Sequence, residues 1–250
     1  MMKVIFVGAG PGDKELITLK GYNALKEADM VIWAGSLVNE ALLEYCKDDV
    51  EIYNSALMHL EEIMATCAKG VRAGKKVVRL HTGDFSIYGS LREQIEGLQA
   101  LGVEYELIPG VSSFLGAASS LGVEYTVPEV SQSLIITRRG GKTPVPEKES
   151  LKAFAKHGTS MVIFLSSTYV EEVCKELIEG GYDGLTPAAI VFKATWPDEE
   201  IIRGTLITLP ALAKVSNIHK MSLIMVGDFL GHEFNLSKLY HKDFKHEFRP

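Results

Sequence analysis

The sequence has few cysteines and no excess of positive charge, and each shortage argues against a class of protein. Three cysteines occur in 250 residues, at Cys46, Cys67 and Cys174, and no two lie close enough to form a metal knuckle. Such sparse cysteine use fits the reducing cytoplasm, where disulfides are rare. The formal net charge of −6 gives no support to a nucleic-acid partner, which would favour a basic surface. We therefore expect a cytoplasmic protein that binds no nucleic acid.

Long apolar runs are also lacking. The first one, Val4–Val7, stops at Gly8, which makes it too short for a signal peptide or a membrane span. Internal repeats and low-complexity tracts are absent as well. We expect no membrane partner.

Familiar catalytic and metal-binding signatures are missing. The chain has no Gly-x-Ser-x-Gly elbow and no His, Cys and Asp cluster with metal-ligand spacing, so we expect no protein-bound metal. Four of its histidines lie in unrelated contexts, at His59, His81, His157 and His219.

One glycine-rich stretch invites a dinucleotide-binding interpretation. Gly8–Gly12 follows the first apolar run, but the third glycine of that fingerprint would fall at Asp13. A carboxylate there would repel a pyrophosphate. An NAD(P)-dependent or flavin oxidoreductase is therefore kept only as an alternative.

The first half of the chain alternates apolar, β-branched runs with segments of helical spacing. This alternation is typical of a largely parallel sheet covered by helices on both faces. The predicted strands are residues 3–7, 30–33, 50–53, 77–82 and 105–108, and the predicted helices are residues 18–28, 57–71, 90–101 and 114–121.

The second half follows a different pattern, after an expected linker at 122–128. We expect a first domain at residues 1–121 and a second at 122–250. A Thr168 capping box is expected to open a helix that ends at Gly180. The connection between strands 188–193 and 201–206 is too short for a helical crossover, so we predict an antiparallel hairpin and a mixed sheet. Other expected segments are strands 133–138, 161–165 and 222–226, a mobile loop at 139–150, and a tail from 231 without assigned chemistry.

The stretch Val77–Gly89 is the first candidate for a functional site. Its strand breaks at Gly83 and Asp84, and a Ser90-x-x-Glu93 capping box then opens a helix. Open α/β sheets bind ligands outside the carboxyl ends of their strands. Gly83 allows a close backbone approach and Asp84 adds a charge. The same stretch also fits a plain strand-to-helix turn.

Two neighbouring features also fit either a ligand-binding role or a purely structural one. Ser112 and Ser113 open the helix after strand 105–108, where free N–H groups suit a carboxylate or another acceptor; they also fit a plain N-cap. His81 lies beside the Gly83 loop, where it either faces a ligand or is a satisfied structural histidine.

Five segments together carry a family resemblance. Taken together, and in the order in which they occur along the chain, these segments resemble the tetrapyrrole (uroporphyrinogen/precorrin) methylases, which use S-adenosylmethionine. Finer features resemble the precorrin-4 and cobalt-precorrin-4 C11-methyltransferases of cobalamin synthesis. The five segments are Val7–Asp13, Arg79–Gly89, Ile108–Ser113, Lys193–Leu206 and Ser222–Gly227, and the finer features are Trp33–Val38, Met58–Glu62, His81–Asp84 and Thr143–Glu147.

The resemblance implies an α/β fold of two αβα domains, each with a parallel or mixed sheet, a ligand cleft between them, and a homodimer. It implies methyl transfer from S-adenosylmethionine to C11 of precorrin-4 or cobalt-precorrin-4, leaving S-adenosylhomocysteine. The donor contacts carried over are Pro11, Gly83, Asp84, Phe85, Ile87, Tyr88, Ser112, Ser113, Leu165, Ala194 and Thr195.

The substrate's carboxylates call for hydrogen-bond donors and positive charges. Each candidate also fits an ordinary ion pair or a solvated surface. The candidates are His81, Arg79, Arg138, Arg139 and Lys142.

Two positions depart from the family pattern. Many relatives have proline where this chain has Phe85. The uroporphyrinogen-methylating branch has an aspartate, proposed as a base, where this chain has Ala34, so no general base is carried over. An anion beside the sulfonium would stabilise the ground state more than the transition state. We therefore expect Asp84 to shape its loop or to bind a remote part of the donor.

Three alternatives stay open beside this interpretation. They are another methylase of the same fold, of the uroporphyrinogen-III/precorrin-2, diphthine or ribosomal-RNA type; an oxidoreductase; and a non-catalytic tetrapyrrole carrier. Whether the substrate already contains cobalt is left open.

Overall fold

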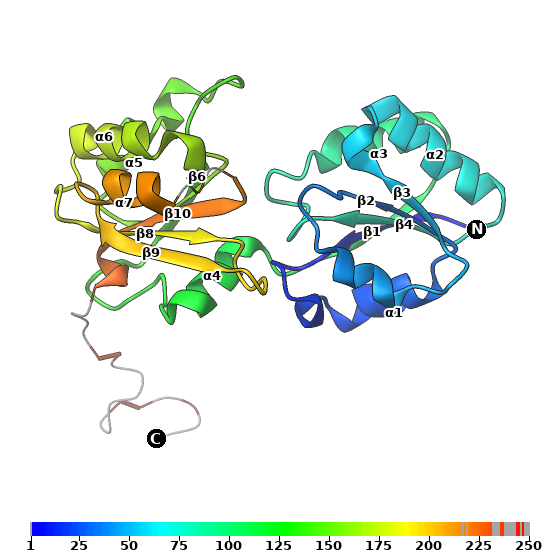
Figure 1. Cartoon of the computed structure of the whole chain (residues 1–250), viewed down its shortest axis with the longest axis horizontal. Helices are drawn as coiled ribbons and strands as arrows, with labels where there is room; N and C mark the ends of the chain where they lie inside the picture. Colours follow the sequence, from blue (N-terminus) through cyan, green and yellow to red (C-terminus); the bar gives the residue numbers. More distant parts are fainter. Residues whose placement is uncertain are drawn as a thin grey trace. The chain divides into compact units, whose positions relative to one another are not determined.

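The computed structural model describes residues 2–216, 218, 220–231, 236–237, 244–245 and 247. The chain forms two compact units, coloured by sequence in Figure 1. Unit 1 comprises Met1–Gly116 with Lys193–Asp198, and unit 2 comprises Ala117–Phe192 with Glu199–Pro250. We expected two continuous domains that meet after residue 121. The structure instead divides the chain between Gly116 and Ala117. The later segment Lys193–Asp198 joins unit 1 because it packs on the loop after the first strand.

Unit 1 is built on a five-stranded sheet with the order β3-β2-β4-β1-β5. Every neighbouring pair is parallel, as the β/α alternation predicts. The strands are β1 (Val4–Gly8), β2 (Met30–Trp33), β3 (Glu51–Asn54), β4 (Val77–His81) and β5 (Tyr105–Ile108).

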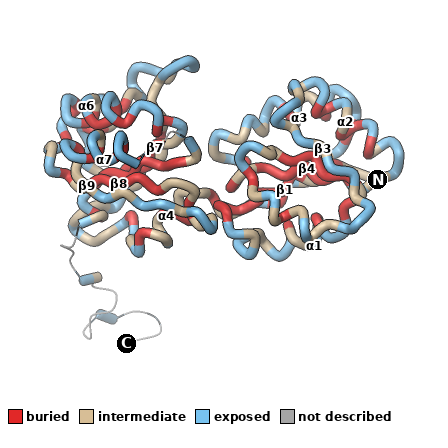
Figure 2. Tube along the Cα trace, viewed as in Figure 1, coloured by how far each residue is buried: buried red, intermediate tan, exposed pale blue. Residues whose placement is uncertain are grey.

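Helices cover both faces of this sheet (Figure 1). Successive strand side chains point to opposite faces, so Phe6 packs under α2 and α3, whereas Val7 packs over α1 and η2. The buried strands form the middle layer in Figure 2. The helices are α1 (Leu19–Glu27), α2 (Leu60–Arg72) and α3 (Leu91–Ala100), with 3-10 turns η1 (Lys14–Leu16), η2 (Glu40–Tyr45) and η3 (Ser55–Leu57). Helix α4 (Ser113–Leu121) begins in unit 1 and belongs to unit 2 from Ala117 on.

Unit 2 contains a mixed sheet with the order β6-β7-β10-β8-β9. β6 and β7 are parallel, the remaining pairs are antiparallel, and β8 with β9 forms the predicted hairpin. The strands are β6 (Leu134–Arg138), β7 (Ser160–Phe164), β8 (Pro187–Phe192), β9 (Glu200–Thr205) and β10 (Ser222–Val226).

Three helices cover one face of this second sheet (Figure 1), and Leu177 and Leu209 pack with Met161 and Ile190 in its core. The Tyr125 and Phe229 rings pack against each other at 5.1 Å. We predicted α6 but neither α5 nor α7. The elements are α5 (Leu151–Ala155), α6 (Val170–Gly180) and α7 (Leu209–Ser216), with 3-10 turns η4 (Glu147–Glu149), η5 (Ser167–Tyr169) and η6 (Asp228–Leu230).

Both predicted capping boxes are wrong. Ser90 has φ 49° and makes no side-chain cap hydrogen bond. Tyr169 takes the N-cap position of α6, also without such a bond, and Thr168 lies in the preceding 3-10 turn. Ser90 takes a left-handed conformation in place of the extended backbone typical of an N-cap, and Thr168 is itself part of a 3-10 turn, so neither side chain caps its helix.

Within the part of the chain that the structure describes, no helix is long and apolar enough to cross a membrane. His219 and most of the tail after Gly231 lie outside the described residues.

Candidate functional site

Three glycines bring the carboxyl ends of β1, β4 and β5 into backbone-to-backbone contact. A Cβ on Gly8 would lie 2.5 Å from the Gly110 nitrogen, and a Cβ on Gly110 would lie 2.2 Å from the Gly83 carbonyl oxygen. Gly83 has φ 56° and exchanges two backbone hydrogen bonds with Gly10, at 3.1 and 3.2 Å. Only residues without a side chain allow this approach. We call Gly8, Gly83 and Gly110 the glycine junction.

Asp84 ties the glycine junction together from one side. Its Oδ2 accepts the Gly110 N–H at 2.8 Å, and its Oδ1 accepts the Ser86 N–H at 2.9 Å and the Ser86 hydroxyl. Burial raises the pKa of the Asp84 carboxyl, but the hydrogen bonds from Ser86 and Gly110 outweigh burial and bring the pKa below its usual value. These contacts support the hypothesis that Asp84 shapes its loop.

The loop after β1 lies beside this junction and beside a segment from much later in the chain. The Asp13 N–H donates to Thr195 Oγ1 at 3.0 Å. A Cβ on Gly116 would lie 2.7 Å from Pro11 Cβ and 3.2 Å from Thr195 Cγ2. The same construction on Gly83 would lie 3.5 Å from the backbone of Ser112 and Ser113. The structure therefore gathers loops that the sequence separates by more than half the chain.

Most of the expected donor contacts lie in the loops around the glycine junction. All of them except Leu165 belong to unit 1, in the connections after β1, β4 and β5 and in the segment 193–198. Leu165 belongs to unit 2, directly after β7, with an exposed side chain. Ile87 and Tyr88 lie in the turn that leads to α3.

Strained backbone marks three of the expected donor contacts. Tyr88, Leu165 and Thr195 have φ values of 54°, 52° and 68°. Positive φ is uncommon for any residue other than glycine and is a clear outlier for β-branched threonine. Such strain concentrates at functional sites, where surrounding contacts hold it in place.

Phe85 is one of the expected donor contacts, at a position where many relatives have proline. Its ring is buried in the core cluster beneath α2 and α3 and stands edge-on to the His81 ring at 6.3 Å. The side chain anchors the loop from inside, which leaves only its backbone for the site.

Arg79 and His81 are buried on the sheet face beneath α2 and α3, not exposed to a ligand's carboxylates. The Arg79 guanidinium donates to Gln94 Oε1 at 3.0 Å and to the Ile32 carbonyl at 3.2 Å. Burial lowers the pKa of Arg79 to about 10. Burial, and then the Arg79 charge, lowers the pKa of His81 to about 3, so the imidazole is neutral near pH 7. These features correct the two substrate-binding assignments, because neither side chain offers a charge at the surface. Arg79 is an internal hydrogen-bond donor, and His81 is buried and neutral, with no hydrogen-bond partner for its Nε2 among the described residues.

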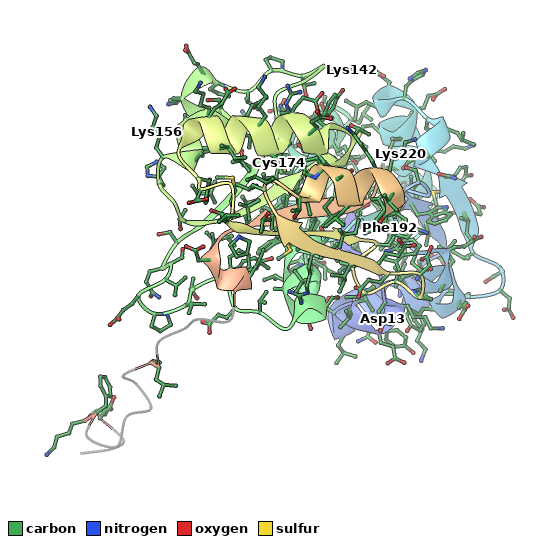
Figure 3. The ribbon with its side chains drawn as sticks, turned by 60° about the vertical axis from the view of Figure 1, so that its left-hand side comes forward. Asp13, Lys142, Lys156, Cys174, Phe192 and Lys220 are labelled. Atoms are coloured by element: carbon green, nitrogen blue, oxygen red, sulfur yellow. The ribbon has the colours of Figure 1, made fainter. Side chains whose placement is uncertain are left out.

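The three remaining basic candidates belong to the β6 end of unit 2. Arg138 donates to the carbonyls of Thr143 and Pro144 at 3.0 and 2.8 Å and so holds the loop that contains them. Arg139 donates to Glu176 at 2.8 Å and lies over the Tyr169 ring. Lys142 is exposed in the same loop (Figure 3). Lys142 is therefore the candidate whose exposure best suits an anionic ligand.

Two further features of unit 1 were missed by sequence reasoning. The first feature is that the Asn39 and Trp196 side chains both donate hydrogen bonds to the loop after β1. The Trp196-Pro197 pair in the short connection between β8 and β9 was the only local sign of the Trp196 contact. Large apolar side chains are also exposed in the connections after β2, β3 and β4 and in the first turn of α4. We call them the apolar rim: Leu37, Leu57, Tyr88 and Leu115.

Among the described residues, no group of three or more His, Cys, Asp or Glu side chains is placed to hold a metal ion.

Comparisons with known proteins identify the family of the chain. The family model for tetrapyrrole (corrin/porphyrin) methylases matches residues 3–210. The cobalt-precorrin-4 C(11)-methyltransferase of Methanocaldococcus jannaschii is 57% identical over 99% of this chain and 96% of its own length. The precorrin-4 C(11)-methyltransferase of Pseudomonas aeruginosa is 41% identical over 100% of this chain and 99% of its own.

Solved structures show the same relation. The X-ray structure of the cobalt-precorrin-4 methyltransferase CbiF has a TM-score of 0.90 and 44% identity, covering 92% of this chain and 97% of its own. The uroporphyrin-III C-methyltransferase of Thermus thermophilus, complexed with S-adenosylhomocysteine, has a TM-score of 0.76 and 29% identity, covering 91% and 98%.

Replacing Gly110 tests the glycine junction. We expect Gly110→Ala to lower the free energy of unfolding by about 1–3 kcal/mol, because the new methyl group collides with the Gly83 carbonyl. Thermal unfolding measures the loss. Gly141→Ala is the matched control, since a Cβ there meets nothing within 4 Å. Equal melting temperatures for both variants would show that the three backbones have room to separate.

Acid unfolding tests the burial of His81. Between its ordinary pKa near 6.5 and its folded value of about 3, the unfolded chain binds a proton that the folded chain does not. Stability is therefore fully present above pH 6.5 and falls as the pH decreases through this range. We expect His81→Leu to weaken the pH dependence of the unfolding free energy, measured in urea at pH 7 and pH 5. The exposed His157, changed to Gln, serves as control; an unchanged slope in His81→Leu would contradict the assignment.

Proposed function

Because the chain belongs to the tetrapyrrole (corrin/porphyrin) methylase family, we propose that it transfers a methyl group from S-adenosylmethionine to C11 of cobalt-precorrin-4. The product is cobalt-precorrin-5, an intermediate of cobalamin synthesis. The observation that carries the proposal is the 57% identity to a cobalt-precorrin-4 C(11)-methyltransferase over nearly the whole of both chains. The lower identity of 41% to a precorrin-4 enzyme favours the cobalt-containing substrate.

The residues at the carboxyl ends of β1, β4 and β5 fit the methyl donor. Gly83 packs against the Ser112 and Ser113 backbone and has no side chain of its own, so a ligand at this turn would meet main-chain groups directly. The first residues of α4, at Ser113, present N–H groups that suit the carboxylate of an amino acid. Pro11, Ala194 and Thr195 complete the surroundings from the other side.

When bound, S-adenosylmethionine supplies a methyl group already activated by a sulfonium. The protein therefore needs no nucleophile of its own, and its contribution is to align the ring carbon with that methyl group. Alignment of this kind removes several kcal/mol of a barrier. The rigid backbone contacts of the glycine junction suit it to this role.

Asp84, His81 and Ala34 are the positions at which a general base would be sought. Both Asp84 oxygens accept hydrogen bonds from the protein's own loops. His81 is buried, and its Nε2 has no hydrogen-bond partner among the described residues. Ala34 stands at the end of β2, where it offers no acid–base group. We propose no general base.

The apolar rim supports a large, flat substrate. Leu57 in particular is 86% exposed directly after β3, at the sheet end where open α/β folds bind ligands. The rim side chains follow the strands of unit 1 at their carboxyl ends, where they are available to the apolar faces of a ligand. We propose that the rim contacts the macrocycle and that the protein acts as a homodimer.

Methyl transfer with a labelled donor tests the function directly. We expect the protein to add one labelled methyl group to cobalt-precorrin-4, located at C11 by NMR, and to act less well on metal-free precorrin-4. Uroporphyrinogen III and precorrin-2 serve as alternative acceptors. If uroporphyrinogen III or precorrin-2 is labelled and precorrin-4 is not, the protein belongs to another branch of the family. Macrocycle binding without any transfer would make it a carrier.

Asp84→Asn separates a loop-shaping carboxylate from a catalytic one. The amide keeps one acceptor but turns an NH₂ group toward the Gly110 or Ser86 N–H. Because hydrogen bonds to charged groups are worth about 1.5–3 kcal/mol, we expect S-adenosylhomocysteine to bind roughly ten- to a hundred-fold more weakly in calorimetry. The exposed Asp48→Asn is the control. Lost turnover with intact donor affinity would instead assign Asp84 to the chemistry.

A further inference from the structure

The segment Lys193–Asp198 connects two strands of unit 2 but belongs to unit 1. It follows β8 and leads into β9, which form the antiparallel hairpin of the second sheet. We call this segment the strap. A hairpin of the ordinary kind needs two to five residues and no partner elsewhere, so the packing of the strap on unit 1 calls for a separate reason.

The strap holds one loop of unit 1, residue by residue. The Trp196 Nε1–H donates to the Pro11 carbonyl at 3.2 Å, and Thr195 Oγ1 accepts the Asp13 N–H at 3.0 Å. Between these two contacts, the Asn39 side chain donates to the Gly12 carbonyl at 2.9 Å. Polar backbone groups of three successive residues are therefore bonded, two of them by the strap.

The Trp196 ring also packs directly on Gly12. A Cβ on Gly12 would lie 2.0 Å from Trp196 Cδ1, so the indole edge occupies the space that any side chain at this position would need. On the strap itself, the Lys193 ammonium lies 5.2 Å from the centroid of the Trp196 ring and forms an ion pair with Asp198. The ring is thus fixed by both the loop and the strap.

The strap carries backbone strain that these contacts must offset. Lys193 and Thr195 have φ values of 47° and 68°. Residues held in this region cost on the order of 1–3 kcal/mol each and persist only where surrounding contacts over-determine them. A connection selected only to join β8 to β9 would relax this strain.

We propose that Trp196 is a positioning residue for the methyl donor. Its N–H and its ring hold Pro11–Asp13 in the shape that admits S-adenosylmethionine, and so determine donor affinity without taking part in methyl transfer. The inference rests on the proposed function. Trp196 would act on donor binding through its contact with the Pro11–Asp13 loop, and not through a contact with the donor itself. Because the bound and reacting states use the same loop shape, losing the contact weakens binding of both equally.

Two variants separate the ring from its N–H. Trp196→Phe keeps an aromatic ring on Gly12 and loses the donor to Pro11, whereas Trp196→Ala loses both. One neutral hydrogen bond is worth about 0.5–1.5 kcal/mol, so we expect S-adenosylhomocysteine to bind roughly two- to twelve-fold more weakly to Trp196→Phe in calorimetry, and still more weakly to Trp196→Ala. In steady-state assays, the donor KM rises by the same factor while kcat at saturating donor stays within about two-fold.

Controls distinguish the possible failures. Glu200→Gln, an exposed change just beyond the strap, is expected to leave donor affinity unchanged. Circular dichroism of each variant shows that it folds. Wild-type affinity in both Trp196 variants would overturn the inference, and so would a loss confined to kcat. Absence of S-adenosylhomocysteine binding in the unaltered protein would count against the proposed function instead.

Discussion

The close approach of three backbones at the carboxyl ends of β1, β4 and β5 is the constraint on which the site depends. Gly8 and Gly110 meet with no space for a methyl group, and Gly83 closes the contact from β4. Asp84 fixes the arrangement by accepting the Gly110 N–H. Because these contacts involve the main chain, they are insensitive to side-chain motion and give a ligand a rigid surface. The parallel sheet brings the three strands to one edge, and the glycines let them meet there.

The loop after β1 depends on this junction and on the strap together. Its backbone groups are held by Asn39, Thr195 and Trp196, so its shape is specified by residues far apart in the chain. The arrangement suits a reaction in which the donor is already activated and placement is the protein's main contribution. The buried, neutral His81 and the internally bonded Asp84 fit the same account, since neither is a charged group free to bind a substrate carboxylate.

Much of the fold was predictable, because apolar runs and helical spacing directly reflect burial. The five strands of unit 1 and the β8–β9 hairpin follow from local pattern and connection length. The predicted caps at Ser90 and Thr168 were wrong because Ser90 takes a left-handed backbone conformation and Thr168 lies inside the 3-10 turn before α6. Motifs of the family predicted donor contacts at Gly83, Ser112 and Thr195, and the structure brings the loops that carry them together in unit 1. Burial of Arg79 and the hydrogen bond from Trp196 to Pro11 depend on long-range contacts, which no local pattern reports.

A crystal structure of the protein with S-adenosylhomocysteine tests the central claim most directly. We expect the ligand to lie against the Gly83 turn, the start of α4 at Ser112 and the strap at Thr195, with the Pro11 carbonyl still bonded to the Trp196 indole. A ligand bound elsewhere would contradict the account. The cavity of about 530 Å³ beside Ser131, Phe154 and His157 in unit 2 offers one such place.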